Sequence, residues 1–422
     1  MERKEAVLEI KIQGSLRDMA EDIRGCRQHP SFPSSKDEIF RKPDKTTLKY
    51  SIAKGHLAAM EFVTLYCRSY IPRLWTLMLA CSSHISMLQE STRSVEHHDY
   101  YLPQELHKFP EIVKKIDKKF KTSFDLYKKA IDKGMQKQDA MYCLPLYTLT
   151  GDSFKLNLRE LYHLKLVYPN IITEMYDWCI RKLSLTERIT PGFDFDIKTW
   201  LEKRKAVNNI TRYDPCPIIV SDEDPKNYEK YFNKIKSQND TKLSNCSGPF
   251  KSKEIEFMAK RLHDPVYAGI LKTKTSIRFD FACDLSVLHE LLRHRTLDRN
   301  LLPITYSSNF NYCNHREWKD KNLHKEYNQN NKELESLYHF LVEGIPKSIA
   351  AGVLPHSLIA HGNINCNFKS MLDFLGQRLC KRAKPGIQKL ANSLKDQIQK
   401  RYQLDDKLFY NCDRCVDSCD FK

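Results

Sequence analysis

Apolar residues recur at helical spacing in two lysine-rich stretches of this chain. In "FPEIVKKIDKKFKTSF", Ile112, Ile116 and Phe120 are four residues apart and lysines lie between them. This spacing places the apolar side chains on one face of a helix and the lysines on the other. The apolar positions of the second stretch are Ile387, Leu390, Ala391, Leu394 and Ile398. Both stretches are therefore predicted to be amphipathic surface helices with solvated lysines.

The helical and apolar periodicity is interrupted once, near the middle of the chain. From Arg212 to Lys253 the sequence is rich in Asp, Lys, Asn, Ser and Pro and has no sustained apolar period. Such composition is typical of linkers and exposed insertions. The predicted organisation is a first repeat at 1–200, a polar linker or insertion at 201–262, a second repeat at 263–402 and a cysteine-containing tail at 403–422.

Two landmarks recur in the halves on either side of this break. Leu144-Pro145 is followed, twelve residues after the proline, by Asn157-Leu158-Arg159, and Leu354-Pro355 is followed at the same distance by Asn367-Phe368-Lys369. An apolar helix that runs into polar residues precedes each landmark, near Cys81 in one half and Arg293 in the other. Matched landmarks at nearly equal separation predict a duplicated domain.

The net charge and the cysteines of the chain indicate which ligands and which compartment to expect. Its 422 residues carry a formal net charge of +16, which predicts attraction to phosphates on nucleotides, nucleic acid or lipid. The start, "MERKEAVLEIKIQG", has no apolar core of signal-peptide length, and the longest apolar run, Leu74 to Leu88, is too short to span a bilayer. We therefore expect a protein that is neither secreted nor inserted in a membrane, with its 14 cysteines reduced in an intracellular compartment.

Motifs in both repeats resemble parts of the flavin-dependent thymidylate synthase signature, R-H-R-x-x-S-x-N-E-x-S-x-R-Y. In the second repeat the resemblance rests on Arg293-His294-Arg295, with Asn300 and Tyr306 beyond. The first repeat resembles other parts of the family pattern, in "GHLAAMEF", "SMLQESTR" and "YCLPLYTLTGDSFKLNLRELYHL". The resemblance covers about Tyr50 to Leu183 and Tyr267 to Leu390.

The resemblance implies a fold and a set of site residues. Each repeat would be an α+β domain in which an antiparallel sheet packs against helices, and the family binds FAD and dUMP where several subunits meet. Arg378 would be the catalytic residue that polarises the pyrimidine ring and stabilises its anion. Substrate binding would fall to Gln89, Ser91 and Arg93, with Ser91 and Arg93 holding a phosphate. Cofactor binding would fall to His56, Glu61, Arg293, His294, Arg295, Asn157, Arg159, His163 and Asn367.

Neither repeat keeps the whole family pattern. In the second repeat the phosphate-binding positions are Leu301, Pro303 and Thr305, and the upstream acidic position is Thr273. In the first repeat the R-H-R positions are Cys81, Ser82 and Ser83, and the ring-polarising arginine is Tyr168. A further family arginine is Met141 in one repeat and Ala351 in the other.

The surviving groups also have structural interpretations. Arg293, His294 and Arg295 can cap a helix C-terminus, where cations meet the helix dipole. Ser91 and Arg93 can form an exposed turn, and Asn157 and Arg159 can brace the fold. In the tail, Cys412 and Cys415 have the spacing of a zinc site but lack a fourth ligand in the sequence, so we expect a reduced tail without zinc.

These observations leave three hypotheses for function. The first is a degenerate tandem homologue that has lost the reaction, and with it FAD, and serves as a structural or interaction subunit. The second is an active FAD-dependent enzyme that converts dUMP to dTMP at a site shared between the repeats. The third is a basic nucleic-acid-binding protein. Because the family is a homotetramer of single domains, we expect a homodimer or a subunit of a larger assembly.

Overall fold

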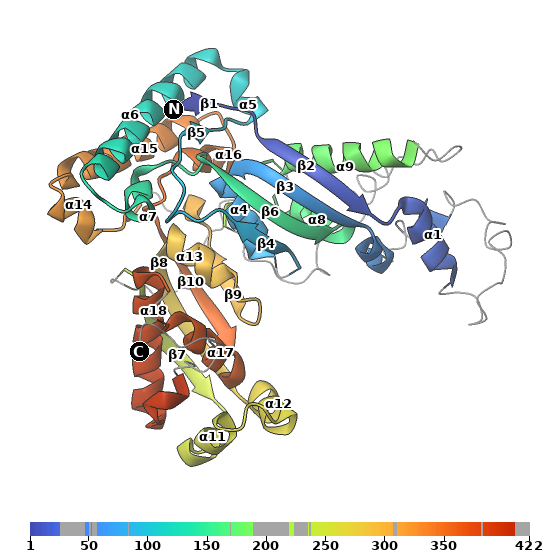
Figure 1. The fold of residues 1–422 in the computed structure, drawn as a ribbon, viewed down its shortest axis with the longest axis vertical. Coiled ribbons are helices and arrows are strands. Elements are labelled where there is room, and N and C mark those ends of the chain that lie inside the picture. Colours follow the sequence, from blue (N-terminus) through green and yellow to red (C-terminus); the bar gives the residue numbers. More distant parts are fainter. Residues whose placement is uncertain are drawn as a thin grey trace. The chain divides into compact units, whose positions relative to one another are not determined.

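Strands and helices are placed over most of the chain in the computed structural model (Figure 1). Backbone contacts divide the chain into two compact units. Unit 1 is drawn from Met1–Lys121, Leu146–Pro215 and Gly344–Gly352, and unit 2 from Thr122–Pro145, Cys216–Glu343 and Val353–Lys422. The described residues are 1–25, 47–49, 52, 57–82, 84–168, 170–188, 219–222, 235, 238–306, 310–380 and 383–409.

Unit 1 is built on a four-stranded antiparallel sheet in the order β2-β3-β6-β4. Side chains on β6 alternate between buried and accessible positions, as expected where one face of a sheet packs on a core and the other faces solvent. A small parallel pair, β1 with β5, completes the strands described in this unit. The bounds are β1 Glu2–Arg3, β2 Val7–Gln13, β3 Thr64–Pro72, β4 Ser86–Gln89, β5 Asp99–Tyr100 and β6 Leu149–Asn157.

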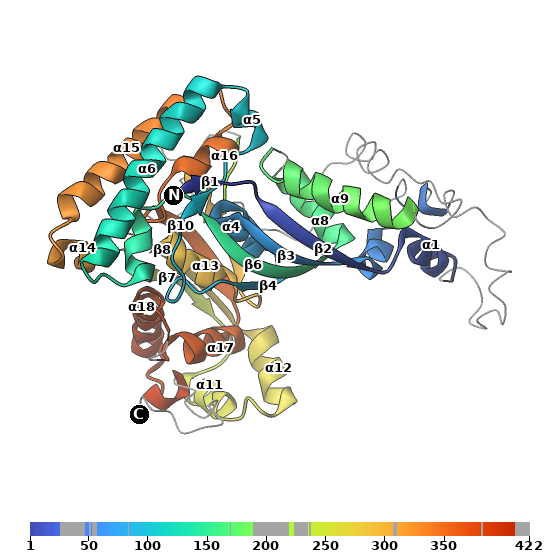
Figure 2. The same ribbon diagram turned by 45° about the horizontal axis from the view of Figure 1, so that its top comes forward.

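The apolar run that begins at Leu74 forms α4, and every residue of this helix is buried. Its sequence, RLWTLMLAC, is apolar on all sides, so the helix lies in the interior instead of on the surface. Figure 2 shows α8 and α9 running beside the sheet. The remaining elements of unit 1 are α1 Leu16–Gly25, η1 Leu57–Phe62, α4 Arg73–Cys81, α5 Gln104–His107, α8 Leu158–Val167, α9 Thr173–Arg188 and α16 Lys347–Ala350, while α6 Pro110–Asp132 has residues in both units.

Unit 2 contains a second four-stranded antiparallel sheet in the order β7-β8-β10-β9. Its central strands β8 and β10 are buried along most of their length. Helices α17 and α18 lie beside this sheet in both views (Figure 1 and Figure 2). The strands are β7 Asp240–Ser247, β8 Ser276–Asp284, β9 Asp298–Leu302 and β10 Ile359–Cys366.

The helices of unit 2 include the second predicted amphipathic helix, α18. All five of its predicted apolar positions are buried, and the first predicted helix is likewise observed as α6. Both predictions are confirmed. The bounds are α7 Lys137–Ala140, η2 Met141–Cys143, α11 Ser252–Ala259, α12 Pro265–Lys274, α13 Leu285–Leu292, η4 Ile304–Tyr306, α14 Arg316–Asp320, α15 His324–Leu341, α17 Phe368–Arg378, α18 Pro385–Tyr402 and η6 Asp406–Phe409, and η5 is Ala351–Val353.

The predicted duplication is visible in the order of elements. In each sheet two long central strands are followed by helices, β3 by α4 and β8 by α13, then β6 by α8 and β10 by α17. The α+β class with two antiparallel sheets is therefore confirmed. The compact units do not coincide with the sequence repeats, because unit 1 takes in Gly344–Gly352 and unit 2 takes in Thr122–Pro145.

The stretch predicted to be a linker contains ordered elements. Strand β7 pairs with β8 along its length, and α11 follows it, so the second sheet begins before residue 263. The correction has a physical reason. Strand β7 reads DTKLSNCS, whose burial pattern leaves most side chains accessible, and an edge strand held by backbone hydrogen bonds needs few apolar residues.

Several further findings concern the chemistry expected of the chain. The described cysteines form no disulfide, and burial raises the pKa of the Cys143 and Cys283 thiols. Within the described ranges, no group of three or more His, Cys, Asp or Glu side chains is arranged to hold a metal ion. None of the described helices has the length and apolarity needed to cross a bilayer. The candidate zinc-site cysteines of the tail, Cys412 and Cys415, lie outside the described residues.

Candidate functional site

The candidate site of unit 2 forms where α13 and α17 end. Strand β8 ends at Asp284, whose side chain accepts a hydrogen bond from the Val287 amide at 2.9 Å and so caps α13. Helix α13 then carries Glu290 and leads to His294, while α17 ends at Arg378. Residues at the ends of two helices are thereby brought together although 84 positions separate His294 from Arg378.

Arg378 is held by partners within unit 2. Its Nε donates to Nε2 of His294 at 2.6 Å, its Nη1 donates to the Glu290 carboxylate at 2.9 Å, and its Nη2 donates to the Glu290 carbonyl oxygen at 3.4 Å. Lys384 Nζ lies 3.5 Å from the other Glu290 carboxylate oxygen. The predicted catalytic residue is therefore engaged with a histidine and a carboxylate of its own unit.

The sequence prediction did not include Glu290 or Lys384. A signal for Glu290 was present in the spacing, because it precedes His294 by four residues, and a helix that continued to His294 would place both side chains on one face. In the structure α13 ends at Leu292, two residues before His294. The pairing with Arg378 could not be predicted from the spacing of residues along the chain, since Glu290 and Arg378 are on two helices and 88 positions apart in the sequence. Arg378 and Glu290 side chains are 18% and 14% exposed, so most of this charge pair is removed from solvent.

The Arg293-His294-Arg295 triplet contains one buried and two exposed side chains. His294 is buried, whereas Arg293 and Arg295 are exposed. Arg293 is the C-cap residue of α13, which agrees with the helix-capping interpretation of its position. A different arginine, Arg299 on β9, donates to the carbonyl oxygen of Leu292 at this helix end. Arg299 was missed because the capping contact comes from a neighbouring strand.

The positions that replaced the phosphate-binding groups of the second repeat are buried. Leu301 packs in the core, Pro303 is buried, and the Thr305 hydroxyl donates to the Ser221 carbonyl oxygen at 2.8 Å while accepting from the Ser221 amide at 2.9 Å. The Ile304 amide also donates to the carbonyl oxygen of Ile219. Residues 219–221 thus satisfy the Thr305 hydroxyl and the Ile304 backbone amide.

Asn157 and Asn367 have the same role in the two repeats. Each is the N-cap residue of the helix that follows a central strand, accepting from the Glu160 amide at 2.8 Å and from the Ser370 amide at 2.9 Å. An N-cap side chain satisfies one of the backbone donors that a helix leaves unpaired at its start. The shared asparagine therefore has a structural explanation in both repeats.

Removing either cap should weaken the fold by a similar amount. We expect Asn157→Ala and Asn367→Ala each to lower the free energy of unfolding by about 1 kcal/mol, the usual cost of losing an N-cap side chain. Asn157→Asp and Asn367→Asp keep the acceptor and should retain most of the stability. Urea-induced unfolding of the four variants measures the difference, and equal stability of the Ala and Asp variants would contradict the capping role.

The first repeat keeps its polar residues in two separate contacts. Arg159 pairs with Glu61 at an exposed position of the surface. His163 is buried and lies 3.5 Å from Glu160, which also accepts from the Ser82 hydroxyl. Burial opposes ionisation of Glu160, but the hydrogen bonds from His163 and Ser82 outweigh it and lower the pKa of the carboxyl.

The predicted substrate residues of the first repeat lie at the end of β4. Gln89 donates to the Thr76 hydroxyl at 2.9 Å, and the Ser91 hydroxyl accepts from the Arg93 amide at 3.3 Å. Ser91 and Arg93 are exposed residues of a turn, as the structural interpretation expected. His56 lies outside the described residues.

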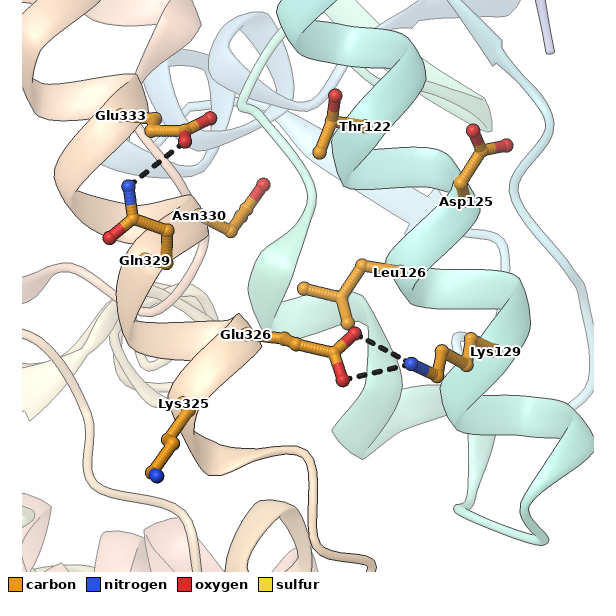
Figure 3. Close-up of a pocket in the computed structure, with 9 residues that line it drawn as sticks. All are labelled: Thr122, Asp125, Leu126, Lys129, Lys325, Glu326, Gln329, Asn330 and Glu333. Carbon is orange, nitrogen blue, oxygen red and sulfur yellow. Dashed lines mark hydrogen bonds and ion pairs between the residues drawn. The ribbon is translucent and has the colours of Figure 1, made fainter.

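A cavity of about 540 Å³ lies in unit 2, between α15 and the second half of α6 (Figure 3). Across it, Lys129 on α6 pairs with Glu326 on α15 at 2.8 Å, and along α15 the Gln329 amide donates to the Glu333 carboxylate at 3.0 Å. Its lining carries three carboxylates and two lysines, a balance that does not favour an anionic nucleotide. None of the predicted site residues lines it. The lining residues are Thr122, Asp125, Leu126, Lys129, Lys325, Glu326, Gln329, Asn330 and Glu333.

One protein family matches both halves of the chain. The model of the thymidylate synthase complementing protein family matches residues 8–168 and 235–402, which together make up most of the chain. The chain belongs to the thymidylate synthase complementing protein family. The two matched segments correspond to the two repeats, and the second match begins at residue 235, ahead of β7, in agreement with the corrected boundary.

One solved structure is similar to part of this family member. The chain is similar to a UMP/dUMP methylase, PolB, from Streptomyces cacaoi, bound with 5-Br dUMP. The two are 16% identical, the likeness covers 39% of this chain and 78% of that chain, and the TM-score is 0.32. No curated protein matches the chain.

The burial of His294 makes the stability of this family member depend on pH. Burial, followed by the charges of Arg378, Arg299 and Arg293, lowers the pKa of His294 to about 3. Neutral His294 is also what the contact requires, because its Nε2 accepts the Arg378 hydrogen bond. The unfolded chain binds a proton near pH 6.5, so this contribution to stability is complete above that pH and is lost as the pH falls.

We expect the wild-type free energy of unfolding to fall by about 1.4 kcal/mol for each pH unit below 6.5 on account of His294 alone. His294→Gln removes the titrating group and should flatten that part of the curve, although it lowers stability at neutral pH. The matched variant is His97→Gln in unit 1, because burial also lowers the pKa of His97 to about 3. Urea-induced unfolding between pH 5 and 7.5 measures the slopes, and parallel curves for wild type and His294→Gln would contradict the assignment.

Proposed function

We propose that this protein is a catalytically inactive member of its family that acts as a structural or interaction subunit. The observation that carries the proposal is the engagement of Arg378. Three of the five N–H groups of its guanidinium donate to His294 or Glu290, so moving the side chain away to reach a pyrimidine ring would break these contacts. A buried charge pair separated in this way leaves a carboxylate and a guanidinium uncompensated, which is costly.

A second observation supports the same conclusion. In the second repeat the places of the family's phosphate-binding side chains are taken by Leu301, Pro303 and Thr305, which are buried and, at Thr305, bonded to Ser221. A phosphate placed there would meet no charge-assisted donor from these three residues. Each such hydrogen bond contributes about 1.5–3 kcal/mol, so its loss weakens nucleotide binding strongly.

The test of this proposal is made on the purified full-length chain. We expect no flavin absorbance in the blue region, no retention of added FAD on gel filtration, and no dTMP formed from dUMP in the presence of FAD, a reductant and a one-carbon donor. Bound flavin at about one per chain, or dTMP formation that is lost in Arg378→Ala, would support the alternative of an active enzyme and overturn the proposal.

The assembly state is part of the proposal and is measured separately. Because the family is a homotetramer of single domains, we expect the tandem chain to be a homodimer or to join a larger assembly. Light scattering of the purified protein gives its mass. A monomer that stays monomeric over the whole accessible concentration range would contradict the homodimer.

A further inference from the structure

Two neighbouring helices of unit 2 present exposed aromatic and cationic side chains together. Helix α11 and helix α12 lie side by side in Figure 1 and Figure 2. Phe257 on α11 is 46% exposed and Val266 at the start of α12 is 63% exposed, which is high for side chains of this kind. We call the face formed by Lys253, Phe257, Arg261, Val266, Tyr267 and Lys274 the α11–α12 surface.

The Arg261 guanidinium and the two aromatic rings of this surface contact one another. The Arg261 guanidinium carbon lies 3.8 Å from the centre of the Phe257 ring, and its Nη1 donates to the Phe257 carbonyl oxygen at 3.1 Å. The Tyr267 ring meets Phe257 edge to face, with centres 5.5 Å apart and planes at 89°. A guanidinium placed over an aromatic ring can itself offer a plane on which a nucleic acid base stacks.

Lysines accompany the stacked groups at helical spacing. Lys253 precedes Phe257 by four residues and Arg261 follows it by four, so the three lie on one side of α11 and its end. On α12, Lys274 follows Tyr267 by seven residues, which returns it to the same face. Lys253 and Lys274 are exposed. Cations therefore border the aromatic groups on both helices.

The nearby carboxylates are used within the helices. Glu254 accepts from the Lys251 amide at 2.7 Å at the start of α11, and Asp264 accepts from the Val266 amide at 2.8 Å at the start of α12. Glu256 pairs with Lys260 at 2.6 Å. Residues 251–274 hold six Lys and Arg side chains against these three carboxylates, so the surface has a positive excess within a chain of net charge +16.

From this arrangement we propose that the α11–α12 surface binds single-stranded nucleic acid. Bases stack on the plane of Arg261 and against the exposed parts of Phe257 and Tyr267, while Lys253 and Lys274 contact phosphates. Single strands suit the surface better than duplexes because their bases are free to stack on side chains. The aromatic side chains of the lysine-rich helix α6, Phe120, Phe124 and Tyr127, are buried, whereas Phe257 on α11 is exposed. This difference favours α11 and α12 as the site.

The proposal is tested on the full chain with fluorescein-labelled oligo(U) and oligo(dT) of about 16 nucleotides, a length that spans one compact binding site. Fluorescence anisotropy is measured from low to physiological salt. Phe257→Ala combined with Arg261→Ala should weaken binding about ten-fold or more, since stacking contributes that much per base. Arg261→Lys should lose part of the affinity with an unchanged salt dependence, because it keeps the charge but not the plane.

Two further variants separate stacking from charge. Lys253→Ala combined with Lys274→Ala should reduce the slope of log affinity against log salt by ~0.7 for each lost phosphate contact. Lys121→Ala combined with Lys128→Ala removes the same charge from α6 and should change affinity much less. Circular dichroism checks that each variant is folded, which is expected because Phe257 and the four lysines are exposed and Arg261 is only half-buried.

Three outcomes would overturn the proposal. One is the absence of binding at low salt, and another is equal affinity of wild type and the Phe257→Ala, Arg261→Ala variant. The third is binding of a duplex of the same length as tightly as the single strand, because charge alone would then account for the affinity. A chain that binds oligonucleotide and also forms dTMP would overturn the proposed inactivity but leave this inference standing.

Discussion

Replacing Glu290 by Ala is expected to lower the free energy of unfolding by about 3 kcal/mol, because removing one partner of a mostly buried ion pair leaves the other charge uncompensated. Glu290 is the carboxylate partner of Arg378 at 2.9 Å and of Lys384 at 3.5 Å. Without it, two cations would lie close together beside neutral His294. The expected loss is therefore larger than that for an exposed ion pair such as Arg159 with Glu61.

Matched variants distinguish loss of charge from loss of packing. Glu290→Gln keeps the shape and one acceptor and should cost less than Glu290→Ala. Glu61→Ala, at the exposed pair, should change stability by less than about 1 kcal/mol. Replacing Glu290 and Arg378 together by Met removes both charges and should recover part of the loss. Urea-induced unfolding at pH 7.5 measures all four, and similar costs for Glu290→Ala and Glu61→Ala would contradict a buried pair.

Replacing Gly352 by Ala is the second change for which we expect a large effect. A Cβ atom at this position would lie 2.2 Å from Cζ of Tyr147, so the ring must move. Tyr147 is fully buried, its amide donates to the Gly352 carbonyl oxygen at 2.8 Å, and its hydroxyl donates to the Ile349 carbonyl oxygen at 2.6 Å. We expect the free energy of unfolding to fall by about 3 kcal/mol, at the upper end of the cost of overpacking a core.

Gly344 is the matched control for this change. Apart from the glycine itself and its two chain neighbours, no heavy atom lies within 4 Å of the position of a Cβ at Gly344, so Gly344→Ala should change stability by no more than about 0.5 kcal/mol. The cause can be checked with Tyr147→Ala, which removes the ring. In that background Gly352→Ala should cost little, because the contact no longer exists. Additive costs of the two substitutions, measured by urea-induced unfolding, would show that the ring is not the obstacle.

Some of the site was already specified by residue spacing along the chain. The repeated Leu-Pro and Asn landmarks predicted the duplication, and the two asparagines occupy equivalent helix starts. The capping interpretation of Arg293 and the turn interpretation of Ser91 and Arg93 also agree with the structure. These are local properties, since a cap or a turn is formed by residues that are neighbours in sequence.

The sequence by itself determined the duplication, the family resemblance and the amphipathic helices α6 and α18, because each depends on spacing within a short stretch. Only the tertiary structure decided that His294 is buried while Arg293 is exposed, and that Arg378 is bound to Glu290. It also decided that β7 joins the second sheet despite its polar sequence. The physical reason is that burial and charge pairing depend on what packs against a residue, and the partners here come from helices and strands far apart in the chain.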